Sequence, residues 1–327
     1  MKNSTAPNRK TGRMIAKNLI VLFAVALAGF CGIQAWFTDN RSAEANGIEV
    51  ECQAPDGIEI AVVGHDAPAP TEYTTGNITL NKTNYPFLEK LQLTEITGDG
   101  TFFRKPALIQ SGGQAHVDTK AEWSEPTANE HYLSFDLYIR SKSQYNISIG
   151  KKSTIKPDAP QLTTQDGTGI KNQSKYGNFS RDSVVGAVRF SVVDYKSAPP
   201  SKKLLWLPAP NILLKQTTDE YTLSDDMPSG ESYSHVYYDT NRVQHTVSST
   251  DVDKAFVVNN DGFDGGKFTY KLGQNQNIAQ LNKSSENDQF YSAMVTCNMW
   301  IEGEDAEARL ALVNGKFKVN LVLTKKS

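Results

Sequence analysis

Two cysteines carry the most defined chemistry in the sequence. Cys52 lies in the alternating segment Gly47–Gln53, and Cys297 lies in the apolar segment Met294–Ile301. In an oxidising compartment such a pair can form a disulfide, and a bridge closing so long a loop would stabilise the fold by about 5 kcal/mol in the chain-entropy model. The alternative is that the two thiols are buried separately. The sequence therefore leaves two hypotheses for Cys52 and Cys297, a structural disulfide and two core thiols.

The histidines do not form a recognisable metal or catalytic motif. They are scattered along the chain at His65, His116, His131, His235 and His245. No two of them have the HExxH spacing or another spacing that places two metal ligands on one helix face, and no GxSxG nucleophile motif is present. These residues predict no metal, no cofactor and no enzymatic activity. An exported hydrolase is kept as a third hypothesis, because the members of a serine triad can lie far apart in sequence.

Two groups of side chains have the oxygen atoms that calcium prefers as ligands. The first comprises Asp251, Asp253, Asn259, Asn260, Asp261 and Asp264, and the second comprises Glu302, Glu304, Asp305 and Glu307. Neither has the EF-hand spacing. Asn-Asn-Asp-Gly and Asp-Gly-Gly in the first group are typical of hairpin turns, and Asp305 is placed to cap a short helix over Ala306–Leu312. We therefore interpret both groups as structural.

One tryptophan is a candidate for contact with a ligand. Trp206 and Trp300 stand within apolar runs and are expected in the core, whereas Trp123 has polar neighbours on both sides. An exposed aromatic ring can pack against the apolar face of a sugar. The sequence therefore predicts Trp123 as the exposed ring of a glycan-binding surface.

The N-terminus has the features of an export signal. Lys2, Arg9, Lys10, Arg13 and Lys17 precede the uncharged run Leu19–Ala35. A basic segment followed by an apolar segment close to the minimum length for spanning a bilayer predicts a signal peptide or membrane anchor over residues 1–35. The remainder, residues 36–327, is then an extracytoplasmic domain, secreted or at the cell surface, and anchored through residues 19–35 where the leader is not cleaved.

Small residues define where the leader could be cleaved. Ile33-Gln34-Ala35 places a small side chain at the last position of the leader, so cleavage between Ala35 and Trp36 is preferred. Ala26-Leu27-Ala28 is a competing site inside the apolar run. Cys31 follows Phe30, which does not suit a lipoprotein signal. Retention of the leader as an uncleaved anchor is the alternative to both cleavage sites.

The residues around this junction resemble a known class of exported proteins. Ala35-Trp36-Phe37-Thr38-Asp39-Asn40, followed by the alanine-rich stretch Ser42–Ile48, looks like the junction of SipW-dependent signal peptides on TasA-like and camelysin-like proteins of Gram-positive bacteria. The resemblance covers about thirty residues. It implies a signal peptidase of the SipW type as the processing partner, and a place at the cell surface or in the extracellular matrix.

Three later segments carry a weaker resemblance to larger uncharacterised clostridial members of this class. They are Leu93–Gly100, Gly186–Val192 and Met299–Asp305. This resemblance indicates kinship and implies no activity. The chain is longer than TasA, so the resemblance does not carry over the ability to form fibres.

The charge of the chain is divided unevenly. The formal net charge is −2, with 34 basic and 36 acidic side chains. Five of the basic residues lie in the leader, which leaves 29 basic and 36 acidic residues after it, a charge of about −7. Nucleic acids and anionic lipid headgroups attract cationic surfaces. The charge therefore disfavours both as partners of residues 36–327.

Alternating apolar and polar residues predict a mainly β domain. The expected strands are Gly47–Gln53, Gly57–Val63, Tyr132–Arg140, Tyr145–Ile149, Val184–Val193, Tyr233–Asp239, Lys254–Val258, Met294–Ile301 and Phe317–Leu323. The sequence Ala54-Pro55-Asp56-Gly57 predicts a turn. Short helices are expected at Leu88–Leu93 and Ile278–Tyr291, and long surface loops at Ser153–Ser183 and Ser197–Lys203. An antiparallel β-sandwich or jelly-roll-like domain after an N-terminal apolar helix accounts for this pattern.

Three functions are compatible with the sequence. The preferred one is an exported, non-enzymatic cell-surface or extracellular matrix protein that assembles with itself or with other matrix proteins. The second is a secreted or membrane-held glycan-binding module, and the third is the exported hydrolase. Self-assembly would use the segment Trp36–Glu49 as an added strand on a neighbouring subunit. The alternative for this segment is that it completes its own sheet or serves as a spacer.

Overall fold

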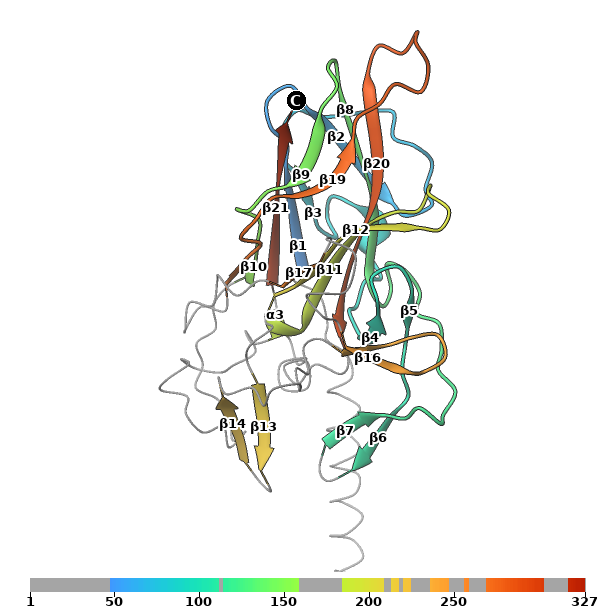
Figure 1. Ribbon diagram of the computed structural model, residues 1–327, viewed down its shortest axis with the longest axis vertical. Coiled ribbons are helices and arrows are strands. Elements are labelled where there is room, and N and C mark those ends of the chain that lie inside the picture. Colours follow the sequence, from blue (N-terminus) through green and yellow to red (C-terminus); the bar gives the residue numbers. More distant parts are fainter. Residues whose placement is uncertain are drawn as a thin grey trace, which may run out of the picture. The chain divides into compact units, whose positions relative to one another are not determined.

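The described part of the protein is an assembly of β-sheets. The computed structural model describes residues 48–111, 114–158, 184–208, 213–217, 220–224, 236–246, 256–258, 269–302 and 317–326 (Figure 1). These ranges belong to the larger of two compact units, Ser42–Ser327, and the smaller unit is Met1–Arg41. The predictions for the leader, its cleavage between Ala35 and Trp36, and the helix Ala306–Leu312 fall outside the described residues.

The first sheet is built around the last strand of the chain. Its strands are β1 (Ile48–Gln53), β3 (Ile78–Leu80), β9 (Asn146–Ile149), β10 (Thr154–Pro157), β18 (Tyr270–Lys271), β19 (Gln276–Gln280) and β21 (Phe317–Lys326). The order is β18-β10-β21-β1-β3, and β9 pairs with β21 and β19. The strand β1 lies parallel to β21 and antiparallel to β3 (Figure 1). Both edges of β1 are therefore paired within the sheet.

A corner between β9 and β10 lets these two strands pair with successive parts of β21. The amide of Gly150 donates to the carbonyl of Val322 at 2.7 Å, and the hydroxyl of Ser153 accepts from the amide of Val322 at 2.9 Å. A Cβ atom at Gly150 would lie 2.8 Å from Thr324 Cγ2 and 2.9 Å from the Val322 carbonyl oxygen. Glycine is therefore required where the chain passes so close to β21.

The second sheet is built around β20. Its strands are β2 (Glu59–Gly64), β4 (Glu95–Gly98), β5 (Phe103–Arg104), β8 (Leu133–Ser141), β11 (Val188–Asp194), β12 (Ser201–Leu207), β17 (Phe256–Val258) and β20 (Tyr291–Glu302). The order is β17-β12-β11-β20-β4-β5, and β8 pairs with β20 and β2. Antiparallel pairs dominate, while β4 is parallel to β20 and β17 is parallel to β12.

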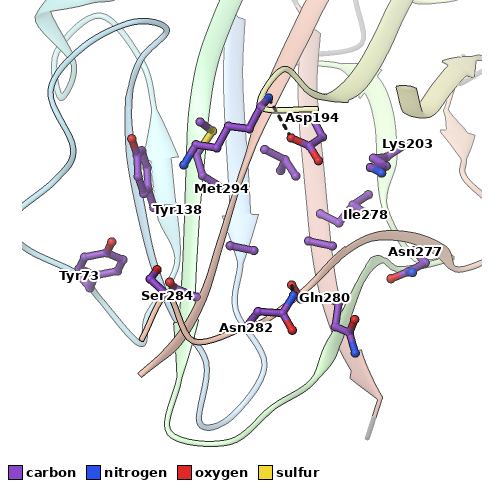
Figure 2. Close-up of a pocket in the computed structure, with 15 residues that line it drawn as sticks. Tyr73, Tyr138, Asp194, Lys203, Asn277, Ile278, Gln280, Asn282, Ser284 and Met294 are labelled. Carbon is purple, nitrogen blue, oxygen red and sulfur yellow. Dashed lines mark hydrogen bonds between the residues drawn. The ribbon is translucent and has the colours of Figure 1, made fainter. Parts of the chain in front are cut away.

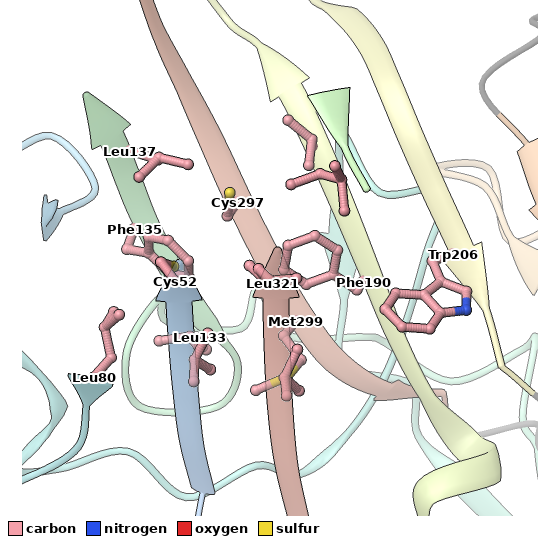
Figure 3. Packing of buried hydrophobic residues seen from close by; sticks show 14 of the residues in the cluster. Cys52, Leu80, Leu133, Phe135, Leu137, Phe190, Trp206, Cys297, Met299 and Leu321 are labelled. Atoms are coloured by element: carbon pink, nitrogen blue, oxygen red, sulfur yellow. The ribbon is translucent and has the colours of Figure 1, made fainter. Parts of the chain in front are cut away.

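One core is shared by the two sheets. Leu133, Phe135 and Leu137 of β8 contribute to it from the second sheet, and β1 and β21 contribute from the first (Figure 3). Alternate residues of β21 are buried, as a strand with one core-facing side requires. This arrangement is that of a β-sandwich, and the prediction of a mainly β domain is confirmed.

The outer face of the second sheet is also covered in part. Thr296 and Asn298 of β20 point away from the shared core and are nevertheless buried. The segment between β4 and β5 lies over them, and the carbonyl of Gly100 accepts hydrogen bonds from Ser191 at 2.8 Å and from Asn298 at 3.4 Å. Gly100 has a φ of +91°, and a Cβ there would lie 2.8 Å from that of Ser191. The close approach of this cover therefore depends on glycine.

The remaining elements are small. Three two-stranded pairs are formed by β6 (Leu108–Ser111) with β7 (Gln114–Val117), β13 (Leu213–Thr217) with β14 (Glu220–Ser224), and β15 (Val236–Tyr238) with β16 (Gln244–Thr246). A 3₁₀ helix, η1, spans Pro86–Leu88 and a four-residue helix, α3, spans Val184–Ala187. In the described part of the chain, no helix is long and apolar enough to cross a membrane.

Several predicted elements are corrected by the structure. Ile278–Tyr291 is not helical, because it contains the end of β19, a turn and the first residue of β20. The predicted loop Ser153–Ser183 begins with β10, and the predicted loop Ser197–Lys203 ends inside β12. The turn at Pro55-Asp56-Gly57 is confirmed by the bond from the Ile58 amide to the Pro55 carbonyl, at 3.1 Å. It passes from one sheet to the other, since β1 and β2 belong to different sheets.

Candidate functional site

A polar groove lies where β19 of the first sheet approaches β12 and β20 of the second. The hollow has a volume of about 630 Å³ (Figure 2). The side chain of Gln276, at the start of β19, donates to the carbonyl of Lys203 in β12 at 3.2 Å. The groove is lined by Tyr73, Tyr138, Asp194, Lys196, Lys203, Asn277, Ile278, Ala279, Gln280, Asn282, Ser284, Ser292, Ala293, Met294 and Val295.

Two tyrosines form one side of this groove. Tyr138 lies on the outer face of β8, opposite Met294 of β20 in the register, and Tyr73 comes from the segment between β2 and β3. Figure 2 shows both rings on the side of the hollow away from Lys203 and Asn277. Burial raises the pKa of both hydroxyls above the ordinary value of 10.0. Both tyrosines are therefore neutral at physiological pH and can donate and accept hydrogen bonds.

The Tyr73 ring is stacked on an arginine. The guanidinium carbon of Arg140 lies 3.8 Å from the centre of the Tyr73 ring and 4.3 Å from the centre of the Phe290 ring. The Nε of Arg140 donates to Glu59 Oε2 at 2.6 Å. Both side chains of this ion pair are half-buried. A planar guanidinium suits such a position between two rings.

Amide and hydroxyl groups line the groove from β19, the turn that follows it and the start of β20. Asn277, Gln280 and Asn282 contribute carboxamides, and Ser284 and Ser292 contribute hydroxyls. Each carboxamide carries both donors and acceptors. The Asn282 amide is oriented by two bonds, because its nitrogen donates to the Gln280 carbonyl at 3.2 Å and its oxygen accepts from Gln144 at 3.0 Å.

Charged groups of both signs stand at the turn between β11 and β12. Asp194 accepts a hydrogen bond from the backbone amide of Lys196 at 3.0 Å, the dashed line in Figure 2. Lys203 lies on the first half of β12. Among the described residues that line the groove, none is histidine, cysteine or glutamate. The amides, hydroxyls and tyrosine rings of the lining can form hydrogen bonds and stacking contacts with a ligand.

A second polar cluster lies under the loop after β2. The Nδ1 of His65 is 2.9 Å from Asp136 Oδ1, and the hydroxyl of Thr296 donates to the same oxygen at 2.7 Å. Asp136 is 5% exposed and His65 is 25% exposed. The His65 ring also packs against Tyr195 in a tilted arrangement, with ring centres 5.4 Å apart. In the described part of the chain, no serine or cysteine side chain bonds to His65, so this pair lacks the nucleophile of a catalytic triad.

The hydrogen bond from His65 to the Asp136 carboxylate gives His65 a pH-dependent effect on stability. It raises the pKa of His65 above 6.5, against the opposing effect of burial, and the charges of Asp136 and Asp66 raise it further. A folded-state pKa above the unfolded value means that the stabilisation is complete below pH 6.5 and is lost as the pH rises through the folded-state pKa.

We expect the free energy of unfolding of the wild type to exceed that of His65→Asn most at acidic pH. The difference between the two should shrink as the pH rises above 6.5 and through the raised folded-state pKa, where His65 loses its proton. Urea unfolding of both proteins across this range measures it. Burial lowers the pKa of His131 and gives it the opposite slope, but that contribution cancels in the difference. A constant difference across the range would contradict the prediction.

The two predicted disulfide cysteines face the same core from opposite sheets. Cys52 lies on β1 and Cys297 lies on β20, each with no exposed surface (Figure 3). Both are free thiols. Burial raises the pKa of Cys297 well above its ordinary value, and the neighbouring Cys52 raises it further. The structure thus agrees with the hypothesis of two core thiols and shows no bridge.

Trp123 is half-buried and does not present the exposed ring that the sequence suggested. Its indole N–H donates to the carbonyl of Asp118 at 2.8 Å, and its ring meets Tyr238 edge to face at 5.5 Å. The guanidinium of Arg242 lies 6.0 Å from the ring centre. Trp123 does not line the groove. Its contacts are those of a packed side chain, and its role in ligand contact stays a prediction.

The two groups with oxygen atoms suited to calcium, interpreted from the sequence as structural, are described in part. Within the first group, all six residues lie outside the described residues. From the second group, Glu302 is described, and it is buried in an ion pair with Arg189. Among the described residues, no three side chains of His, Cys, Asp or Glu come together as metal ligands would.

Neither the groove nor the His65–Asp136 pair was predicted from the sequence. One signal was available, because the alternation of β8 places Asp136, Tyr138 and Arg140 on the face opposite its leucines. Their partners come from distant segments, such as Tyr73 and Phe290 for Arg140 and His65 for Asp136, and these contacts cannot be deduced from sequence spacing. The chain matches no protein-family model, no curated protein sequence and no solved structure.

Proposed function

We propose that this chain is an exported, non-enzymatic cell-surface protein that binds a glycan in the groove. The observation that carries this proposal is the combination of two tyrosine rings with a row of carboxamides in one hollow. The C–H face of a pyranose ring packs on an aromatic ring, while its hydroxyls exchange hydrogen bonds with amides. Charged groups of both signs at the far end add further donors and acceptors.

The described residues support glycan binding in the groove better than they support self-assembly by strand addition. Strand addition through residues 48–53 would need a free edge on β1, and both edges of β1 are paired in its own sheet. At the outer end of the sheet, β3 has three residues, and so short an edge strand resists pairing with another chain. Assembly through residues 36–47 is a separate proposal and rests on the sequence.

Export itself is proposed from the leader. Its basic and apolar segments, together with the junction at Ala35 and Trp36, support cleavage by a SipW-type signal peptidase. An N-terminal apolar helix before cleavage belongs to the proposal of export. A jelly-roll-like connectivity of the sandwich is a separate proposal. The proposed cleavage has a direct test. Sequencing the N-terminus of protein recovered from culture medium tests it, and a start other than Trp36 would contradict this cleavage site.

Removal of one groove tyrosine should abolish most of the binding. We expect Tyr138→Ala in the full-length chain, purified in detergent, to weaken the association with a responding oligosaccharide by tenfold or more, because a central aromatic contact carries about 2 kcal/mol or more. A glycan array identifies the oligosaccharide, and calorimetry measures the affinity.

Trp123→Ala is the matched control, since this aromatic residue lies outside the groove lining. It should bind like the wild type. Loss of binding in Trp123→Ala with retention in Tyr138→Ala would place the glycan at the surface that the sequence suggested. The absence of any binding glycan would count against the proposed function.

A further inference from the structure

Arg140 joins separate walls of the groove. It lies on β8 two residues beyond Tyr138, and its register partners are Glu59 of β2 on one side and Ser292 of β20 on the other. Tyr138 and Ser292 both line the groove. The strand neighbours of Arg140 therefore place its backbone beside residues that line the groove.

Its side chain then reaches two further segments. Tyr73 belongs to the connection between β2 and β3, and Phe290 belongs to the turn between β19 and β20, which also carries Asn282 and Ser284. The guanidinium lies between these two rings, at 3.8 Å from the centre of Tyr73 and 4.3 Å from that of Phe290. One side chain thus contacts the segment that supplies a tyrosine and the segment that supplies an amide.

The orientation of the guanidinium is itself fixed. Its Nε donates to Glu59 Oε2 at 2.6 Å, a charge-assisted bond. The segment of Tyr73 has one further attachment to β2, because Ile60 and Thr74 exchange two backbone hydrogen bonds of 2.8 and 2.9 Å. That bridge fixes the backbone beside Tyr73, whereas the direction of the ring depends on the surface against which it packs.

We propose that Arg140 is the positioning residue of the groove, holding the ring of Tyr73 in the orientation that receives a ligand. The effect of Arg140 on ligand binding rests on the proposed function. The ionic part of the interaction can be met by lysine, but the flat surface between two rings cannot, because an ammonium group has no planar face. Arg140→Lys therefore removes the planar stacking surface and keeps the positive charge.

The experiment combines a signal from Tyr73 with a double-mutant cycle. 3-Fluorotyrosine is introduced at position 73 of the full-length chain, and its fluorine resonance is recorded without ligand. We expect Arg140→Lys to shift and broaden this resonance. Affinity for the oligosaccharide should fall about tenfold in Arg140→Lys, and should fall no further when Arg140→Lys is added to Tyr73→Ala, since the two residues then act as one unit.

Arg104→Lys is the matched control, because Arg104 is similarly half-buried and pairs with Glu125 at 3.3 Å away from the groove lining. It should leave the fluorine signal and the affinity unchanged. Should Arg140→Lys fail to fold, Phe290→Leu removes the other face of the stack, and the same loosening of Tyr73 is expected.

An unchanged fluorine signal would overturn the inference. So would a loss of affinity on Arg140→Lys that is as large in the Tyr73→Ala variant as in the wild type. If the wild type binds no glycan, the proposed function fails, and the fluorine signal still decides whether Arg140 orients Tyr73. The two failures are therefore distinguishable.

Discussion

The two core thiols are expected to be nearly inert in the folded protein. Burial raises the pKa of Cys52 from its ordinary value of 9.0 to about 12, with a smaller effect from the charge of Glu51. The thiolate is the reactive form, so at pH 8 the reactive fraction of Cys52 falls by about a thousandfold. The pKa of Cys297 is raised as well, first by burial. Neither sulfur has exposed surface, which slows reagents further.

The rate of reaction with Ellman's reagent at pH 8 measures this effect in a Cys31→Ser background. Native protein should release almost no chromophore on the timescale in which guanidinium-denatured protein releases two equivalents. Val243→Cys is the positive control, because Val243 is 52% exposed and a thiol there should react at once. Rapid native labelling of Cys52 or Cys297 would contradict the burial. Absence of labelling after denaturation without reductant would show that the two are bridged.

The strands of the core were predictable because apolar residues alternate along them. In β8 and β21, apolar side chains occupy alternate positions, and the structure buries those positions against the shared core. The predictions Tyr132–Arg140 and Phe317–Leu323 therefore lie within three residues of the ends of these strands. A period of two is set by the strand itself and needs no knowledge of its partners.

The predicted helix at Ile278–Tyr291 fails because of a local coincidence. Ile278 and Leu281 are three residues apart, as on a helix face, and both are buried. Ile278 belongs to β19, whereas Leu281 lies just after it, where its amide donates to the Tyr145 carbonyl at 2.9 Å. The polar residues that follow form a turn in which Asp288 accepts from the amides of Ser284 and Ser285. Two apolar residues were too few to define a period.

The groove was not predictable for a different reason. Its walls come from segments that are joined by tertiary contacts, such as the stack of Tyr73 on Arg140 and the bond from Gln276 to Lys203. Each of these residues is ordinary for a surface position. The sequence favoured Trp123 instead because polar neighbours suggest exposure, but Tyr238 and Arg242 pack against its ring.

Buried charges are the hardest feature to read from a sequence, and the pair Arg189–Glu302 is the clearest case. Arg189 of β11 and Glu302 of β20 are 1% and 0% exposed, and their nearest charged atoms are 3.1 Å apart. The indole of Trp300 donates to the same carboxylate oxygen at 3.2 Å. Burying two charges carries a large desolvation cost, which their attraction and hydrogen bonds offset while both are present.

Removal of one member of this pair should therefore cost far more than removal of both. We expect Arg189→Met to lower the free energy of unfolding by about 3–5 kcal/mol, because it removes the opposite charge that the buried Glu302 faces. The double variant Arg189→Met, Glu302→Leu should recover most of that loss, since two apolar side chains leave no buried charge at this position. Urea unfolding monitored by tryptophan fluorescence measures all three proteins.

A more accessible ion pair provides the comparison that isolates burial. Lys318 lies 3.1 Å from Glu49 and 3.1 Å from Asp158, and these three side chains are 36%, 35% and 31% exposed. Lys318→Met should cost less than about 1 kcal/mol, because water screens the two remaining carboxylates. The prediction for the buried pair would be refuted by a cost of Arg189→Met as small as that of Lys318→Met. It would be refuted equally by a double variant less stable than Arg189→Met alone, since separating the buried Glu302 from its opposite charge would then not be the cause of the loss.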